Sequence, residues 1–186
     1  AADLNGDGDM DILSPAPNVN KITWHNNDGD GLFTPYAIRT SASGWTDVYT
    51  ADVDDDGDID IIAGGNGQAW YENNGANSPT FTEHIISSSS GGDYLHVSDI
   101  DQDGDLDIAT ADYWGHLLWW ENDGNQNFTS HVAATGSSCV TSIYTADVDS
   151  DGDIDLVVGE RCNDRVVWYE NDGNEAFTLN IVTTNV

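Results

Sequence analysis

The sequence predicts an all-β protein built from four repeats of about 48 residues, each folding into four antiparallel strands. Three observations support this prediction. An aspartate-rich segment recurs four times in phase, a tryptophan-containing segment follows each copy, and no 11-residue window carries the apolar period of a helix. We expect one continuous region over residues 1–186, with repeats at about 1–40, 41–89, 90–136 and 137–186.

The aspartate-rich segment reads D-x-[ND]-x-D-G-D-x-D, and its copies begin 49, 47 and 48 residues apart. We call the copies acidic loops one to four, at residues 3–11, 52–60, 99–107 and 147–155. They hold 20 of the 34 acidic residues, so the acid is concentrated rather than spread over a solubilising surface. The chain has only four basic residues and a formal net charge of -30, which repels nucleic acid and anionic membranes.

The second repeat illustrates the expected strands. Strand A would cover residues 48–51 and strand B residues 59–63, on either side of the acidic loop, followed by strand C at 68–72 and strand D at 80–87. Their β-branched and aromatic residues favour strands. Asn-Gly or Asp-Gly pairs, which favour tight hairpin turns, stand at 74–75, 123–124 and 172–173. Four antiparallel strands at this period are typical of a β-propeller blade, and blades stack because one alone cannot bury its faces.

A second signature follows every acidic loop. It begins at Trp24, Trp70, Trp119 and Trp168, reads Trp-aromatic-Glu-Asn-Asx-Gly in its fullest form, and is followed by a closing Phe-Thr. With these motifs the chain resembles the FG-GAP/VCBS repeat family, whose calcium-loop blades also occur in integrin-type propellers. The resemblance covers almost the whole chain. It implies a propeller fold, bound calcium, a secreted or surface location, and adhesive or binding roles.

The spacing of each acidic loop suits an oxygen-only cation site. Positions 1, 3 and 5 can converge as the chain curls, glycine at 6 permits the turn, position 7 can offer a carbonyl, and position 9 returns a last carboxylate. Such a site favours Ca²⁺ over Mg²⁺ and excludes zinc. Position 12 is never glutamate and the flanks are strand-like, so the loops are not EF-hands.

We therefore expect about four Ca²⁺ ions, one per repeat, with the first site weakest because Asn5 replaces an aspartate. The alternative is that the loops are merely solvated acidic turns. The predicted metal ligands are Asp3, Asn5, Asp7, Asp9 and Asp11; Asp52, Asp54, Asp56, Asp58 and Asp60; Asp99, Asp101, Asp103, Asp105 and Asp107; and Asp147, Asp149, Asp151, Asp153 and Asp155.

The only cysteines are Cys139, before strand A of the fourth repeat, and Cys162, between its strands B and C. These connections share one face of an up-down blade, so a disulfide is expected, with two free thiols as the alternative. The same face, opposite the acidic loops, carries the most variable residues. There we expect any ligand to contact Trp45, Tyr94, Trp114 or His116. The four repeated tryptophans are expected to lie in the core.

No nucleophile-base spacing, phosphate loop or zinc signature is present, and the carboxylates are assigned to metal, so we expect no enzyme. The leading expectation is an extracellular, calcium-stabilised structural or adhesive module. The alternatives are a carbohydrate-binding lectin, which would recognise glycans through the variable face, and an accessory domain of a secreted enzyme. Surface proteins are further candidate partners, and no apolar run is long enough for membrane insertion.

The first repeat should lack most of its strand A, because only two residues precede Asp3. Three explanations stay open. The chain is a piece of a longer propeller in a longer parent chain, or four repeats close with a truncated first blade, or another copy supplies the strand and creates an oligomer or filament.

Overall fold

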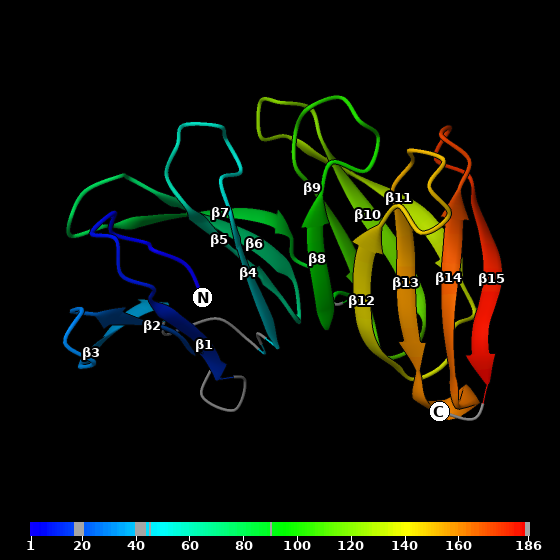
Figure 1. The fold of residues 1–186 in the computed structure, drawn as a ribbon, viewed down its shortest axis with the longest axis horizontal. Helices are drawn as coiled ribbons and strands as arrows, with labels where there is room; N and C mark the ends of the chain where they lie inside the picture. Colours follow the sequence, from blue (N-terminus) through cyan, green and yellow to red (C-terminus); the bar gives the residue numbers. More distant parts are fainter. Residues whose placement is uncertain (17–20, 40–43, 45, 90, 185–186) are drawn as a thin grey trace. The chain divides into compact units, whose positions relative to one another are not determined.

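The computed structural model describes residues 1–16, 21–39, 44, 46–89 and 91–184. It contains four antiparallel sheets, one of three strands and three of four, and strands that follow one another in the chain are neighbours in each sheet (Figure 1). The all-β prediction is therefore confirmed. The strands are β1 (Ile12–Ala16), β2 (Lys21–Asn27), β3 (Phe33–Arg39), β4 (Asp47–Ala51), β5 (Asp60–Gly64), β6 (Gln68–Asn73), β7 (Phe81–Ser87), β8 (Tyr94–Ser98), β9 (Asp107–Ala111), β10 (His116–Asn122), β11 (Phe128–Thr135), β12 (Val140–Ala146), β13 (Asp155–Glu160), β14 (Arg165–Asn171) and β15 (Phe177–Thr184).

The chain divides into two compact units, Ala1–Ser90 with the first two sheets and Gly91–Val186 with the last two. The closure of these sheets into one propeller over residues 1–186 stays a prediction. Strands β4 to β7 match the four strands expected for the second repeat to within one residue at each end. The β-branched and aromatic residues and the Asn-Gly turn locate these strands because both signals are local.

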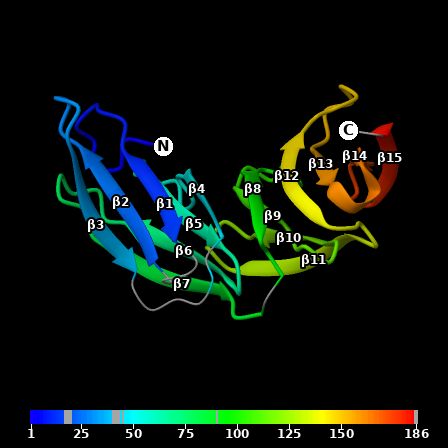
Figure 2. The ribbon, with the colours of Figure 1, turned by 90° about the horizontal axis from the view of Figure 1, so that it is seen from below.

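The first sheet has three strands in the part of the chain that the structure describes, so the expectation that it lacks most of strand A is confirmed. Strand β1 forms one edge and β3 the other, with β2 between them (Figure 2). Before β1, a single antiparallel bridge joins Ala2 to Asp11. That bridge occupies the place where Ala51 pairs with Asp60 in the second sheet.

Each compact unit has its own apolar core. In the first unit the core includes Leu4, Ile22, Trp24, Ile61 and Tyr71. In the second it is drawn from both sheets, as in the packing of Trp119 and Leu117 from β10 with residues of β12 to β14. The core of each unit therefore lies between its two sheets, and the acidic loops lie at the ends of the strands.

The tryptophans expected in the core divide three to one. Trp24, Trp70 and Trp119 are at most 4% exposed. Trp168 is only partly buried, which corrects the expectation for the fourth repeat. The reason is that Trp168 belongs to the last sheet, and within the described residues no later sheet follows to cover it.

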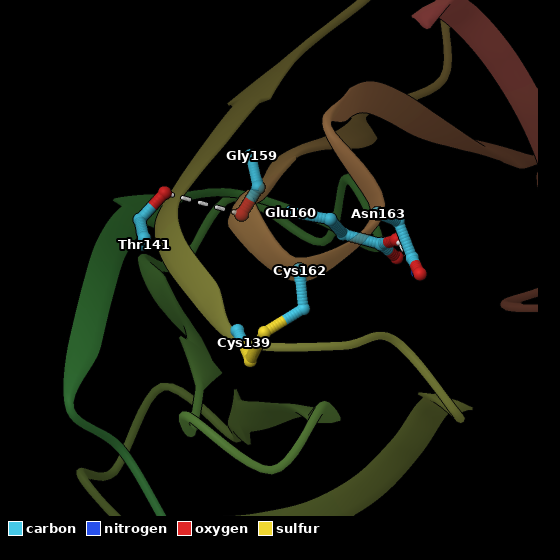
Figure 3. The surroundings of a disulfide bond; sticks show 6 residues. All are labelled: Cys139, Thr141, Gly159, Glu160, Cys162 and Asn163. Atoms are coloured by element: carbon cyan, nitrogen blue, oxygen red, sulfur yellow. Dashed lines mark hydrogen bonds between the residues drawn. A yellow bond between two sulfur atoms is a disulfide. The ribbon is translucent and has the colours of Figure 1, made fainter. Parts of the chain in front are cut away.

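Cys139 and Cys162 form a disulfide, with Cα atoms 5.3 Å apart, as the sequence predicted (Figure 3). Cys162 lies in a short 3₁₀ turn, Arg161–Asn163, between β13 and β14, and Cys139 directly precedes β12. The backbone N–H of Arg161 also donates to the carbonyl of Cys139 at 3.2 Å. Among the described residues, no helix has the length and apolar character that crossing a membrane requires.

Candidate metal sites

Three of the acidic loops bring carboxylates together. In loops two, three and four, the aspartates at positions 1, 3 and 9 each offer an oxygen, and the three oxygens lie within 4.8 Å of one another. The groups are Asp52, Asp54 and Asp60; Asp99, Asp101 and Asp107; and Asp147, Asp149 and Asp155. Each group joins the end of strand A to the start of strand B in one sheet.

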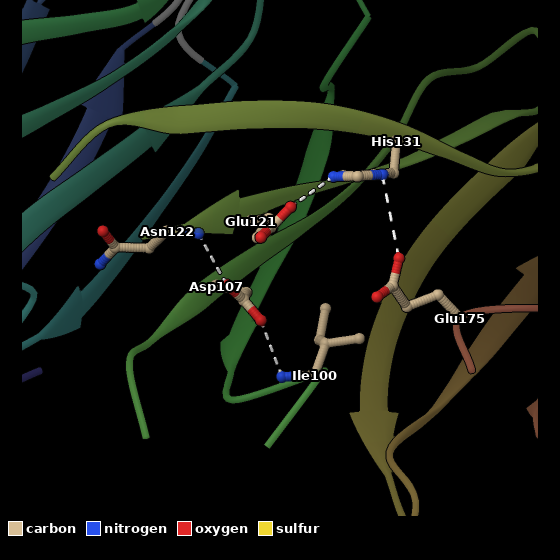
Figure 4. Close-up of polar contacts among 6 residues, drawn as sticks. All are labelled: Ile100, Asp107, Glu121, Asn122, His131 and Glu175. Atoms are coloured by element: carbon tan, nitrogen blue, oxygen red, sulfur yellow. Dashed lines mark hydrogen bonds and ion pairs between the residues drawn. The ribbon is translucent and has the colours of Figure 1, made fainter. Parts of the chain in front are cut away.

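The position-9 aspartate is the buried anchor of each loop. Asp107 is fully buried, and its two carboxylate oxygens accept hydrogen bonds from the backbone N–H groups of Ile100 at 2.9 Å and Asn122 at 2.8 Å (Figure 4). The same pair of bonds recurs at Asp11, Asp60 and Asp155. Position 9 therefore ties its loop to the end of strand C.

The position-1 and position-5 aspartates shape the loop itself. In loop two, Asp52 accepts from the backbone N–H groups of Asp56 at 3.1 Å and Gly57 at 2.9 Å. Asp56 in turn accepts from the N–H of Asp58 at 2.9 Å. Position 5 lies outside the group of three carboxylates, and its bond to position 7 repeats in all four loops.

Two loop oxygens are buried without a hydrogen-bond partner, Oδ1 of Asp54 and Oδ1 of Asp99. Burying a carboxylate oxygen unpaired is costly, so a native structure normally gives such an atom a partner. Both residues belong to the groups of three. Their partner is therefore expected to be a cation that the carboxylates share.

Burial also raises the pKa values of three of these anchors, Asp60, Asp107 and Asp155. Burial raises the pKa of Asp60 to about 6 and that of Asp107 to about 7, although backbone hydrogen bonds oppose the change and neighbouring aspartates reinforce it. Burial raises the pKa of Asp155 in the same direction. Without a counter-ion, these groups resist ionisation, and a bound cation would reverse that resistance.

The donor set fits a hard divalent cation. All ligand candidates are carboxylate or carbonyl oxygens, which suit calcium and do not suit zinc. Among the described residues, no lysine or arginine forms a salt bridge with any of the nine grouped aspartates. Protein cations therefore do not neutralise these groups, which leaves room for a metal ion to do so.

Acidic loop one keeps the fold of the others without the same donor set. Asp3 accepts from the N–H groups of Asp7 and Gly8, as position 1 does in loop two. At position 3, however, the Asn5 amide donates to Asp7 at 2.8 Å and to Asn26 at 2.9 Å. At positions 1, 3 and 9, loop one thus offers two carboxylates, Asp3 and Asp11, where the others offer three; that its site is the weakest stays a prediction.

The position-7 aspartates lie where the sequence did not predict. Their carboxylates rest against the glycine of the hairpin turn between strands C and D, as Asp105 does against Gly124, and a Cβ at that glycine would collide with the carboxylate. The glycine also has φ of +71°, which a side chain would disfavour. The four contacts pair Asp9 with Gly29, Asp58 with Gly75, Asp105 with Gly124 and Asp153 with Gly173.

Of the four residues expected to contact a ligand, the structure exposes Trp114 and His116. Trp114 is 77% exposed and stands edge-on to Tyr113, with ring centroids 5.6 Å apart. His116 Nδ1 lies 2.6 Å from Asp112 Oδ2. Tyr94 instead packs against the core of the second unit, and Trp45 lies outside the described residues.

Sequence reasoning missed the strand-C glutamates that stand beside the loops. Glu72, Glu121 and Glu170 recur at one position of the Trp-containing signature, and each contributes to raising the pKa of the position-3 aspartate of its own repeat, after burial as the main cause. Their in-phase recurrence was the available signal. The signal was ambiguous because the hairpin turn that follows the motif explains its recurrence in the chain equally well.

The chain is thus an all-β protein whose antiparallel sheets follow one another along the sequence. An acidic loop leads into strand B of each sheet. The FG-GAP-like repeat family matches the chain three times, over residues 3–63, 52–110 and 99–158. The chain therefore belongs to the FG-GAP-like repeat family. Each match begins at the first residue of one acidic loop and extends beyond the next loop. No curated protein matches the chain at a significant level.

Proposed function

We propose that this chain is a calcium-stabilised, non-catalytic β-propeller module that acts outside the cell in a structural or adhesive role. The observation that carries the proposal is the grouping of three aspartate oxygens within 4.8 Å at three equivalent loops. The family supports the propeller architecture. The loops supply ligands to the ion, and the ion stabilises the junction of strands A, B and C.

The expected stabilisation is large. A site at free calcium about 100 times its Kd adds about 2.7 kcal/mol to the free energy of unfolding. Four such sites would add on the order of 10 kcal/mol, which is comparable with the whole stability of a typical domain. Millimolar calcium outside the cell would keep the sites filled, and the Cys139–Cys162 disulfide suits the same oxidising location.

The test is metal analysis of the purified chain combined with thermal unfolding. We expect about four calcium ions per chain after dialysis against millimolar calcium, and a fall in Tm of at least about 20 °C in EDTA. Magnesium at the same concentration should restore less of the Tm than calcium does. A chain without bound metal, whose melting curve EDTA leaves unchanged, would overturn the proposal.

Assembly is the second part of the proposal. Strand β1 is an edge of the three-stranded sheet, and an edge strand can pair with an extended segment of another copy or of a longer parent chain. Electron microscopy and light scattering of the calcium-loaded chain should then find oligomers or filaments. A strictly monomeric species at all concentrations would remove this part and leave the calcium proposal intact.

Exposure of Trp114 favours a second candidate, a lectin. An indole ring that is 77% exposed beside Tyr113 and the His116–Asp112 pair could stack on a sugar ring while the polar groups bind hydroxyls. Glycan-array binding at millimolar calcium should be lost in Trp114→Ala and kept in Leu32→Ala, which removes another exposed apolar side chain. The accessory domain of a secreted enzyme is a third candidate, and a catalytic domain in the parent gene would favour it.

A further inference from the structure

The strand-C glutamates are held by side chains of strand D. In each case the glutamate Oε2 lies within hydrogen-bond distance of a strand-D side chain, the residue whose backbone is paired with the repeated tryptophan. The bonds join Glu72 to His84 at 2.8 Å, Glu121 to His131 at 2.7 Å, and Glu170 to Asn180 at 2.9 Å. The glutamates are thus fixed in position, as Figure 4 shows for Glu121 and His131.

On their other side the glutamates occupy the position whose equivalent in the first repeat contacts loop position 3, because Asn5 donates to Asn26 at 2.9 Å. Burial raises the pKa of Asp101, and the charges of Asp103 and Glu121 raise it further. Glu72 acts in the same direction on Asp54. In the repeats that carry a glutamate, both of these equivalent positions hold acids, and this pairing of like charges opposes folding unless a cation is near.

The first repeat shows the neutral version of this contact. Asn26 stands at the glutamate position and Asn5 at loop position 3, and the Asn5 Nδ2 donates to Asn26 Oδ1 at 2.9 Å. Tyr36, which stacks on Trp24, replaces the strand-D donor. All three residues differ together from the other repeats, so both charges are absent in the one acidic loop where no group of three carboxylates is found among the described residues.

We propose that Glu72, Glu121 and Glu170 are positioning residues of the calcium sites, each adding a negative charge behind the three loop carboxylates. This inference rests on the proposed calcium binding. The glutamates lie outside the groups of three, so they act on the ion through the position-3 aspartate or through water bound to the ion. His84, His131 and Asn180 hold them there, and the first loop lacks this contribution.

The decisive variant is Glu121→Gln in the full chain, because glutamine keeps the hydrogen bond to His131 and loses only the charge. We expect calorimetric titration to show one calcium site weakened by about 10- to 100-fold. Terbium, a trivalent ion, should lose more affinity than calcium, because the Coulomb term scales with the charge of the ion. A role confined to holding strand D would leave both affinities unchanged.

Asp164→Asn is the matched control. It removes the same unit of charge from the same compact unit, in the turn before β14, and asparagine tolerates the φ of +44° at that position. Its calcium and terbium affinities should equal those of the wild type. An equal loss in Asp164→Asn and Glu121→Gln would mean that only the net charge matters, and it would overturn the inference.

Adding acidic residues to acidic loop one tests the same inference, and it avoids the misfolding that loss of a native glutamate can cause. Asn5→Asp with Asn26→Glu should raise the number of tight calcium sites by one, and Asn5→Asp alone should produce a weaker site than the double variant. Equal affinity in the two variants would overturn the inference. If the wild type binds no calcium, the proposed function itself fails, whereas normal wild-type binding with an unaffected Glu121→Gln removes only this inference.

Discussion

The Asp107 carboxylate accepts a hydrogen bond from the backbone N–H of Asn122 at 2.8 Å, across 15 residues of the chain (Figure 4). The bond joins acidic loop three to the end of β10. The second oxygen of the Asp107 carboxylate accepts from the backbone N–H of Ile100. Asp107→Asn would leave one of these two buried donors facing an NH₂ group. We therefore expect a loss of about 1.5 to 3 kcal/mol in the free energy of unfolding, measured by urea denaturation in EDTA.

Asp103→Asn is the control for this prediction. Asp103 is exposed at position 5 of the same loop, and its replacement should change the stability of the metal-free chain by less than about 0.5 kcal/mol. Equal effects of the two substitutions would show that Asp107 contributes no more than its charge.

The metal-free chain should become less stable as the pH rises from about 4 to about 7. The folded-state pKa of Asp60 is about 6 and that of Asp107 about 7, both above their ordinary value of 3.8, because both groups are buried. The folded state therefore binds protons more tightly than the unfolded state, and this stability is lost as the pH passes through the raised values.

Thermal unfolding in EDTA checks this prediction, with a higher Tm expected at pH 5.5 than at pH 8.0. With millimolar calcium the order should reverse, because the ion binds the ionised carboxylates and competes with protons. A metal-free Tm that increases towards pH 8.0 would contradict the prediction.

Removing the disulfide should destabilise the fourth sheet. Cys139 and Cys162 are separated by 23 residues, and closing a loop of this size in the unfolded chain is worth about 3 kcal/mol. We expect the double variant Cys139→Ser, Cys162→Ser to lose about that amount in urea denaturation. Dithiothreitol should reproduce the loss in the wild type and have no effect on the double variant; unchanged wild-type stability would refute the prediction.

Trp119 and Trp114 differ in burial, so replacing each by alanine should lower the free energy of unfolding by different amounts. Trp119 is 1% exposed and stacks on His131 with ring centroids 4.6 Å apart, whereas Trp114 is 77% exposed. Trp119→Ala is expected to cost about 3 to 5 kcal/mol and Trp114→Ala less than about 0.5 kcal/mol. Denaturation of both variants at millimolar calcium makes the comparison, and similar losses would contradict it.

Strand positions and loop positions could be predicted from the sequence because their signals are local. The turn at Asn74-Gly75 and the aromatic residues of the strand at 68–72 are signals that need only residues a few positions apart. The pairing of Cys139 with Cys162 also followed, since only two cysteines exist and their connections share one end of a blade.

Contacts across strands could not be predicted in this way. The turn of Asp105 towards Gly124 and the placement of Glu121 between its loop and His131 depend on the register of β9, β10 and β11. A change of register by one residue would send each of these side chains to the other face of the sheet. Trp168 likewise carries the same motif as Trp119, yet its burial depends on whether another sheet covers it.

The sequence by itself determined the repeated all-β architecture, the four acidic loops and the oxygen character of their ligands, because periodicity and residue chemistry are written along the chain. Only the tertiary structure decided which aspartates meet. Positions 1, 3 and 9 converge, position 5 supports the loop, and position 7 turns to the hairpin. The physical reason is that convergence depends on hydrogen bonds from backbone N–H groups of strand C to the position-9 carboxylates, which link residues 13 to 16 positions apart, as from Asn122 to Asp107.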